Sequence, residues 1–205
     1  SLTGTVSASC TDYSVTGGGG AYALAANESV TVTVRFAPAG AGTKTCNVQT
    51  GSSCAAPVAC TGVGELAPQC DVSPGSLDFG TVTIGNHLDK TFRIKNTGGG
   101  SLTGTVSASC TDYSVTGGGG AYALAANESV TVTVRFAPAG AGTKTCNVQT
   151  GSSCAAVGCT GVGQLAPQCD VSPASFDFGT VTIGNHLDKT FRIKNTGGGS
   201  LTGTV

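Results

Sequence analysis

Cysteine is the residue type in this sequence whose number and spacing suggest chemistry most clearly. The chain has 205 residues and ten cysteines. Their spacing contains no C-x-x-C and no C-x-x-C-H, so the motifs of zinc ribbons, thioredoxin-like exchange and haem attachment are missing. Cytosolic proteins rarely carry so many cysteines without metal-ligand spacing, so the pattern predicts disulfide bonds made in an oxidising, extracellular compartment. The disulfide candidates are Cys10, Cys46, Cys54, Cys60, Cys70, Cys110, Cys146, Cys154, Cys159 and Cys169.

The other polar residues do not suggest catalysis. His87 and His186 each follow Gly-Asn in a predicted turn, where a histidine is solvated and could bind metal only if copies converged. Serine is abundant and histidine rare, so no Ser-His-acid triad can be singled out. The glycine runs 17–20 and 117–120 lack the Lys-Ser/Thr and the helix of a phosphate loop, so we expect turns there. We expect no enzyme, no catalytic residue, no cofactor and no metal.

Two N-glycosylation sequons occur, at Asn27 and Asn127. Each precedes the strongest predicted strand, where asparagine also suits a turn.

The charge content limits the partners. Only 10% of the residues are charged and the net charge is -1, which is too little for nucleic-acid or anionic-membrane binding. No apolar run approaches 18 residues, and we find no signal peptide or lipidation motif. We therefore expect no membrane insertion within this chain, with any export signal or anchor outside it.

The chain is a tandem repeat. Residues 1–56 are identical to residues 101–156, and the stretch 70–85, which begins the repeat, returns almost unchanged at 169–184. We expect five segments: 1–64, the C-terminal part of a repeat without its first two strands; 65–69, a linker; 70–163, a complete repeat; 164–168, a second linker; and 169–205, the N-terminal strands of a further repeat.

Both ends of the chain carry Ser-Leu-Thr-Gly-Thr-Val, inside a strand pattern. Domain boundaries normally fall in linkers. Either the chain is an excerpt of a longer array, or residues 169–205 of one copy complete residues 1–64 of a neighbour by strand donation. We favour the excerpt, because the overlap would place two copies of one strand in one position.

Short alternating segments indicate an all-β fold. In residues 128–136, Val130, Val132, Val134 and Phe136 face one way while the intervening residues face the other. Further strands are predicted at 78–84, 91–95, 102–110, 143–149 and 155–160, the last two as a hairpin over 150–153. About seven strands with turns between them predict an antiparallel β-sandwich of immunoglobulin type.

Four motifs carry a family resemblance: L-D-F-G-T-V at 77–82, N-T-G at 96–98, E-S-V-T-V-T-V-R-F-A-P at 128–138 and G-V-G at 161–163. Together they resemble the abnormal-spindle/hydin-type (ASH) immunoglobulin-like domains, and more closely the bacterial choice-of-anchor D repeats. The resemblance implies a seven- or eight-stranded sandwich used in tandem in large bacterial surface or secreted proteins. The cysteine density argues against the cytoskeletal role of the eukaryotic relatives.

In such a sandwich the cysteines can be paired. The final hairpin turns back beside the chain's entrance, which predicts Cys70–Cys154. Strand parity places Cys110, Cys146 and Cys159 inward, so Cys146 pairs with Cys110 or, as the less favoured choice, with Cys159. An odd number cannot all pair within one repeat. The last of the trio bonds to another domain or chain, or stays free and buried.

Two functions fit these features. The first is structural: a repeat unit of an extracellular filament, stalk or surface fibre that docks neighbouring copies of the same repeat. The second is an adhesin-type binding module that recognises a glycan or protein through loops at the sandwich ends. The loops are poor in the aromatic and arginine anchors of binding hot spots, so we favour the structural role.

Overall fold

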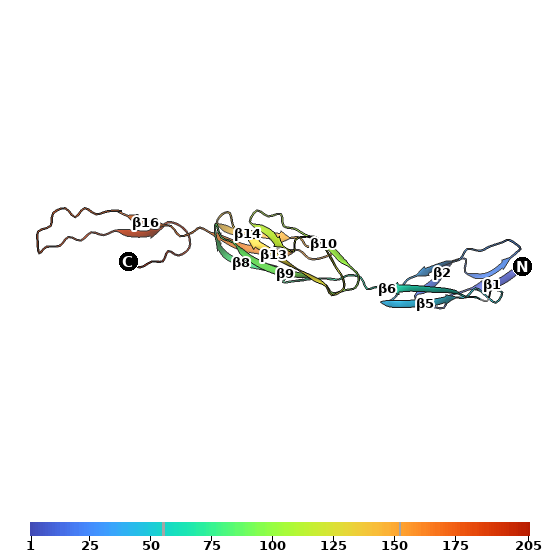
Figure 1. Ribbon diagram of the computed structural model, residues 1–205. Coiled ribbons are helices and arrows are strands. Elements are labelled where there is room, and N and C mark those ends of the chain that lie inside the picture. The colour runs from blue at the N-terminus through green and yellow to red at the C-terminus, as the bar shows by residue number, and fades with distance from the viewer. Residues whose placement is uncertain (55, 152) are drawn as a thin grey trace. The chain divides into compact units, whose positions relative to one another are not determined.

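The computed structural model describes residues 1–54, 56–151 and 153–205, and every regular element in these ranges is a β-strand (Figure 1). The chain divides into two compact units, Ser1–Pro68 with Gly98–Gly100, and Gln69–Thr97 with Ser101–Val205. No helix in the described ranges is long and apolar enough to cross a membrane. The all-β immunoglobulin-like fold class expected from the sequence is confirmed.

Among its described residues, the first unit contains six strands in three antiparallel pairs. β1 pairs with β3, β2 with β4, and β5 with β6. Their bounds are β1 (Leu2–Val6), β2 (Tyr13–Gly17), β3 (Gly20–Leu24), β4 (Thr33–Phe36), β5 (Gly42–Val48) and β6 (Val58–Gly64).

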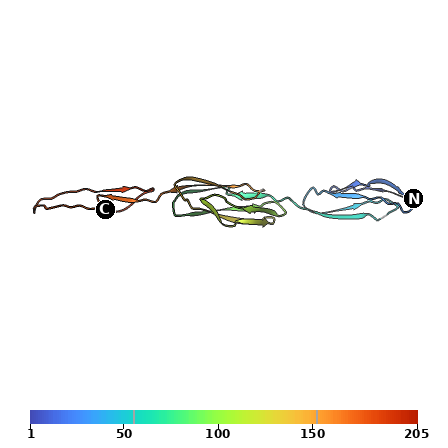
Figure 2. The ribbon, with the colours of Figure 1, turned by 90° about the horizontal axis from the view of Figure 1, so that it is seen from above.

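The central part of the chain contains nine strands among the described residues. They are β7 (Cys70–Ser73), β8 (Ser76–Thr83), β9 (Leu88–Asn96), β10 (Leu102–Val106), β11 (Tyr113–Gly117), β12 (Gly120–Leu124), β13 (Ser129–Phe136), β14 (Gly142–Val148) and β15 (Val157–Gln164). One sheet has the order β11-β13-β9-β7, a second has the order β14-β15-β8, and β10 pairs with β12. Seen from above, these strands form two layers (Figure 2).

The core lies between these layers because the strands alternate apolar and polar side chains. Val132, Val134 and Phe136 of β13 are fully buried, as are Phe92 and Ile94 of β9, whereas Val130 is only partly buried. The Tyr113 ring stacks on Phe136 with centroids 4.7 Å apart. Burial of this alternating face provides most of the stabilisation that a sandwich of this size obtains.

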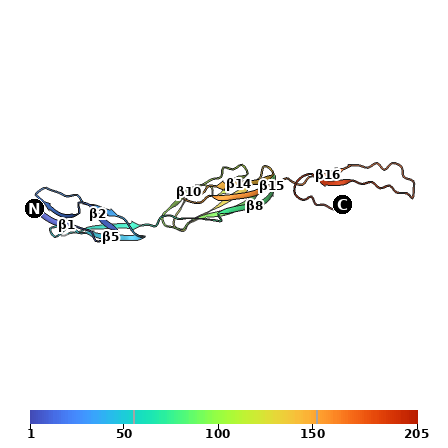
Figure 3. The same cartoon turned by 180° about the vertical axis from the view of Figure 1, so that it is seen from behind.

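The structure corrects three expectations about the strands. Three strands, not two, precede Leu102, because Pro74 has no amide donor and separates β7 from β8. The strand expected at 102–110 ends at Val106, so Cys110 follows it in a loop. The sandwich is not wholly antiparallel, because β15 and β8 pair in parallel, side by side in Figure 3.

The glycine run 117–120 contains a tight turn, as expected from the sequence. The turn joins β11 to β12, two strands that the sequence pattern did not predict. Gly118 and Gly120 have φ angles of +67° and +87°, which favour glycine. A Cβ at Gly118 would lie 2.2 Å from the Thr131 carbonyl oxygen. The turn therefore requires glycine at this position, and β11 and β12 flank it.

The C-terminal residues 169–205 contain two short strands, β16 (Cys169–Ser172) and β17 (Arg192–Asn195), which pair with each other. Residues 175–182 are the counterpart of β8 but form no strand. Large apolar side chains of this segment, among them Phe178, Phe191 and Ile193, are exposed.

Candidate functional site

The first cysteine group of the central part joins a loop to the β14–β15 hairpin. Cys110 and Cys146 form a disulfide with a Cα–Cα distance of 5.9 Å. Cys159 lies opposite Cys146 in the register of the hairpin and is buried as a free thiol. Of the two pairings considered for Cys146, the structure has the favoured one. Burial raises the pKa of the Cys159 thiol, so this cysteine is protonated and unreactive at neutral pH.

The second cysteine group joins the entrance of the repeat to the tip of the hairpin. Cys70 in β7 is bonded to Cys154, with a Cα–Cα distance of 5.5 Å and a sequence separation of 84 residues. This is the pair expected from the return of the final hairpin to the entrance. The Tyr122 hydroxyl lies 3.2 Å from the Cys154 sulfur and donates to the Thr150 carbonyl at 2.6 Å.

In the first unit, Cys10 and Cys46 form the same disulfide as Cys110 and Cys146, with the same Cα–Cα distance of 5.9 Å. Cys60, the counterpart of Cys159, is a half-buried thiol. Cys54, the counterpart of Cys154, is an exposed thiol, and Cys169, the counterpart of Cys70, is another.

Tyr113 anchors the start of β11 to β14. Its hydroxyl donates to the Lys144 carbonyl at 2.9 Å, and Tyr13 makes the same bond to Lys44 at 3.1 Å. Burial, with smaller contributions from Cys159, Asp112 and Asp78, raises the pKa of Tyr113 to about 12. The phenol is therefore neutral throughout the physiological range and serves as a structural donor.

The turn with the N-T-G motif at 96–98 contains a fully buried polar side chain, that of Asn96, which the sequence pattern did not indicate. Asn96 is fully buried; its side-chain oxygen accepts from the Gln69 amide at 3.1 Å, and its Nδ2 donates to the Leu124 carbonyl at 3.1 Å. The neighbouring Thr97 amide donates to the Gln69 carbonyl at 2.7 Å. The polar N-T-G motif thus orders the end of the linker backbone.

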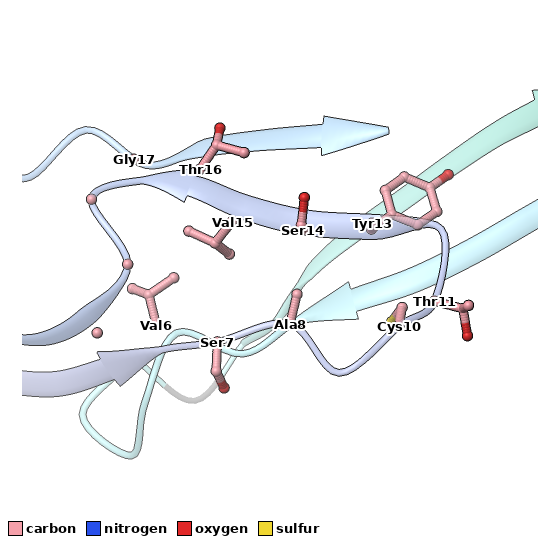
Figure 4. A pocket seen from close by; sticks show the side chains of 13 residues that line it. Val6, Ser7, Ala8, Cys10, Thr11, Tyr13, Ser14, Val15, Thr16 and Gly17 are labelled. Carbon is pink, nitrogen blue, oxygen red and sulfur yellow. The ribbon is translucent and has the colours of Figure 1, made fainter. Parts of the chain in front are cut away.

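An open groove occurs in each unit between the end of one strand and the next hairpin. In the first unit it has a volume of about 800 Å³ and is lined by residues between Val6 and Gly20. Val6 and Val15 point into it, whereas Ser14 and Thr16 point away (Figure 4). The counterpart between Val106 and Gly120 has about 650 Å³. The walls are mainly small side chains and glycine backbone, with no charged residue among the lining residues.

The remaining candidate residues lie apart from these groups. His87 and His186 are exposed. Within the described ranges, no three His, Cys, Asp or Glu side chains are grouped as metal ligands would be. Asn27 and Asn127 of the sequons are exposed and have φ angles of 69° and 67°, the left-handed conformation of a turn.

Comparison with known proteins supports the central part as a recognised domain type. Residues 68–154 match the family described as HYDIN/CFA65/VesB-like, Ig-like domain, and this match confirms the expected ASH-type resemblance. No curated protein sequence matches the chain.

Three solved structures are similar at low sequence identity. The ASH/PapD-like domain 7 of human CEP192 is 13% identical, with 48% of this chain and 87% of that chain covered and a TM-score of 0.40. A protein of unknown function from Porphyromonas gingivalis W83 is 12% identical, with 79% and 86% covered and a TM-score of 0.41. Domains 4 and 5 of the S-layer protein SbsC are 17% identical, with 77% and 98% covered and a TM-score of 0.33.

Proposed function

We propose that this chain, whose central part is an Ig-like domain of the HYDIN/CFA65/VesB-like kind, is a structural section of an extracellular filament, stalk or surface fibre in a bacterium. Neighbouring copies of the same repeat are its partners. The proposal includes no catalytic role, in keeping with a domain class made up mainly of binding and structural modules.

One observation carries the proposal: the same disulfide between a loop and a strand recurs at the same position in both units. Cys10–Cys46 and Cys110–Cys146 each close a loop with a sequence separation of 36 residues. Such a loop contributes about 3.8 kcal/mol in the chain-entropy treatment of disulfides. Disulfides persist in oxidising compartments, and a module that repeats one with its surrounding strands suits exposure outside the cell.

A second function, an adhesin-type module, is favoured by one specific feature. The groove between Val6 and Gly20 recurs between Val106 and Gly120. A repeated groove of this kind would provide two equivalent positions for a glycan or an extended peptide. The small, uncharged lining supplies few binding anchors, so the structural role remains the first proposal.

The location and thiol state of the full-length protein test the structural proposal. Intact cells that make the protein are treated with a membrane-impermeant amine label, and the protein is then isolated under thiol-blocking conditions. We expect a labelled protein in which Cys110 and Cys146 are oxidised. An unlabelled protein with these cysteines reduced would contradict the proposal.

A glycan array probed with the 205-residue chain separates the two functions. Binding that is lost when Ala8 and Ala108, at the groove edge, are replaced by tryptophan would favour the adhesin. The structural role predicts no specific binding. An equal signal from the parent and the tryptophan variant would show that the glycan does not bind in the groove.

A further inference from the structure

Three cysteines of the central part meet at one place in the sandwich. Cys146 of β14 lies directly opposite Cys159 of β15 in the register of the hairpin, and it is bonded to Cys110 of the loop that follows β10. All three line one hollow of about 450 Å³, together with Asn147 and Gly158 among others. A free thiol is therefore held beside a disulfide, an arrangement that neither proposed function requires.

The same group of cysteines occurs in the first unit. Cys46 is bonded to Cys10 and lies opposite Cys60 in the register of the β5–β6 hairpin. Each hairpin thus places one bonded and one free cysteine face to face. The free cysteine is a regular feature of the repeat.

The two hairpin cysteines are near enough to bond to each other. Both side chains are on the inner face, where Cys146 is 6% exposed and Cys159 is 1% exposed. Directly opposite residues of antiparallel strands have Cβ atoms about 4.5–5.5 Å apart, and a disulfide needs about 3.5–4.5 Å. Among the described strands, β14 pairs only with β15, so it is free to approach its partner by this small distance.

The two possible disulfides of Cys146 hold different parts of the domain. Cys110–Cys146 fastens the loop after β10 to the hairpin, across a sequence separation of 36 residues. Cys146–Cys159 would fasten only the two strands of the hairpin to each other. Because the longer loop loses more entropy on closure in the unfolded chain, the structure holds the more stabilising bond. The residues that begin the loop, Ser107 and Ala108, also line the groove between Val106 and Gly120.

We propose that Cys159 is a resolving thiol, which takes over the bond to Cys146 and releases Cys110 as a site for modification by small disulfides. The Cys159 thiolate attacks the Cys146 sulfur, so that the Cys146–Cys159 bond forms and the Cys110–Cys146 bond breaks. The electron pair of the broken bond leaves with the Cys110 sulfur, which takes up the proton that Cys159 lost. The number of disulfides is unchanged, so this step needs no oxidant and no reductant.

The exchange moves the free thiol from the core to the loop. Cys159 is buried, whereas Cys110 is half-buried and lies outside the strands. A small disulfide such as oxidised glutathione reacts with the released group: the Cys110 thiolate attacks one glutathione sulfur, forms a mixed disulfide and expels the other glutathione as a thiolate. The ligand of this site is therefore a disulfide compound, and the bond it forms is covalent.

The surroundings of Cys159 keep the exchange slow at neutral pH. Burial raises the pKa of this thiol, and the thiolate is the attacking species. The nearby titratable groups on the neighbouring elements are Tyr113 of β11, Asp112 before it, Asp78 of β8 and Lys144 of β14. β15 carries no other titratable residue. The two carboxylates oppose the thiolate, the lysine favours it, and Tyr113, with a pKa of about 12, stays neutral. The rate should rise about tenfold per pH unit until the thiol is ionised.

The exchange goes beyond the proposed structural role and does not depend on it. An extracellular array carries Cys110–Cys146 at neutral pH whether or not Cys159 can displace Cys110, so failure of the experiment below would leave that role standing.

The test is irreversible trapping of Cys110 in the full chain. Iodoacetamide at pH 7 first blocks the accessible thiols Cys54, Cys60 and Cys169. The chain is then incubated at pH 9 with isotopically heavy iodoacetamide and digested with trypsin without reduction.

The tryptic peptides report each cysteine separately. Cys110 is the single cysteine of residues 96–135, and residues 96–100 distinguish this peptide from residues 1–35 of the first unit. We expect the heavy label on Cys110 and a disulfide between Cys146 and Cys159 inside the peptide 145–189. The labelling rate should fall about tenfold from pH 9 to pH 8.

A pair of variants identifies the attacking thiol. Cys159→Ser should lower the labelling of Cys110 by at least about tenfold, because the attacking sulfur is gone. Cys60→Ser, which changes the counterpart in the first unit, is the matched control and should leave the labelling of Cys110 unchanged. The Cys146–Cys159 bond is mapped in the parent chain, so the test holds even if Cys159→Ser does not fold.

Oxidised glutathione in place of the heavy reagent tests the modification itself. It should give a glutathione adduct on the peptide 96–135 of the parent chain and none in Cys159→Ser.

Four results would overturn the inference. The heavy label could appear on Cys159 while Cys110 stays bonded to Cys146, or neither cysteine could be labelled after prolonged incubation at pH 9. Cys110 could be labelled equally in the parent chain and in Cys159→Ser, which would show that another group displaces it. The glutathione adduct could be missing from a chain in which iodoacetamide traps Cys110.

Discussion

The disulfide between Cys70 and Cys154 allows a stability prediction with an internal control. The bond closes a loop with a sequence separation of 84 residues. The chain-entropy treatment gives a contribution of about 4.6 kcal/mol for a loop of this length. Replacement of both cysteines by serine should therefore lower the free energy of unfolding of the central part by about 4.6 kcal/mol. That is a large fraction of the stability of a typical domain.

Cys54→Ser is the control because Cys54 has the same preceding sequence as Cys154 and no disulfide partner in the chain. It should change the free energy of unfolding of the central part by less than about 0.5 kcal/mol, because Cys54 lies in the first unit and is a free thiol.

The assay must measure the unfolding of the central part separately from that of the first unit, although residues 1–56 and 101–156 are identical. Hydrogen exchange by mass spectrometry along a guanidinium series serves this purpose, because the peptide with Gly75 and Leu77 differs in mass from its counterpart with Ala174 and Phe176. A loss below about 1 kcal/mol in the double variant, or a loss of equal size in Cys54→Ser, would refute the reasoning.

Three further predictions concern the packing and the polar contacts of the central part. Asn96→Ala should lower the free energy of unfolding by about 2–4 kcal/mol, because the Gln69 amide and the Leu124 carbonyl lose their side-chain partner. Urea denaturation measures this change, and an effect below about 0.5 kcal/mol would contradict the prediction. Tyr113→Phe should cost about 0.5–1.5 kcal/mol at pH 7 through the lost hydrogen bond. The phenol has a raised pKa of about 12 in the folded state against 10.0 in the unfolded state, so the stability it contributes is complete below pH 10 and falls as the pH rises towards 12. The difference between parent and variant should therefore shrink over that range, and a constant difference would count against the assigned pKa. Gly161→Ala should cost about 1–3 kcal/mol, because its Cβ would lie 2.5 Å from the Phe136 ring. Gly158→Ala is the matched control and should cost nothing measurable in thermal unfolding, since the nearest atom to its Cβ is 3.8 Å away.

The sequence predicted the features that depend on side-chain periodicity. Residues 128–136 alternate strictly, and the structure has β13 from Ser129 to Phe136 with its apolar face in the core. Such alternation is local, so it can be read without the fold. The cysteine pairs needed the expected sandwich as well: Cys70–Cys154 followed from the return of the last hairpin, and Cys110–Cys146 from an inward strand face, although Cys110 lies in a loop after β10.

Features that depend on backbone geometry or on distant contacts could not be read in this way. The strands around Gly118 have only five residues each, and a glycine-rich turn gives no alternating signal. The parallel pairing of β15 with β8 joins segments about 80 residues apart, for which periodicity carries no information. The burial of Asn96 depends on Leu124 and Gln69, which reach it only in the folded sheet.

The difference between identical residues in two settings is a further limit of sequence reasoning. Residues 29–32 and 129–132 have the same sequence, yet only the second set forms a strand. Strand formation here requires a partner strand, because a β-strand obtains its hydrogen bonds from its neighbours. No local pattern could distinguish the two.

We propose for this chain the role of a disulfide-stabilised structural array outside the cell. Non-reducing peptide mapping of protein released from the surface of intact cells tests it most directly. We expect Cys70 bonded to Cys154 and Cys110 to Cys146, with Cys159 recovered as a thiol. Recovery of Cys70, Cys110, Cys146 and Cys154 as thiols, or of the protein only from the cell interior, would contradict it.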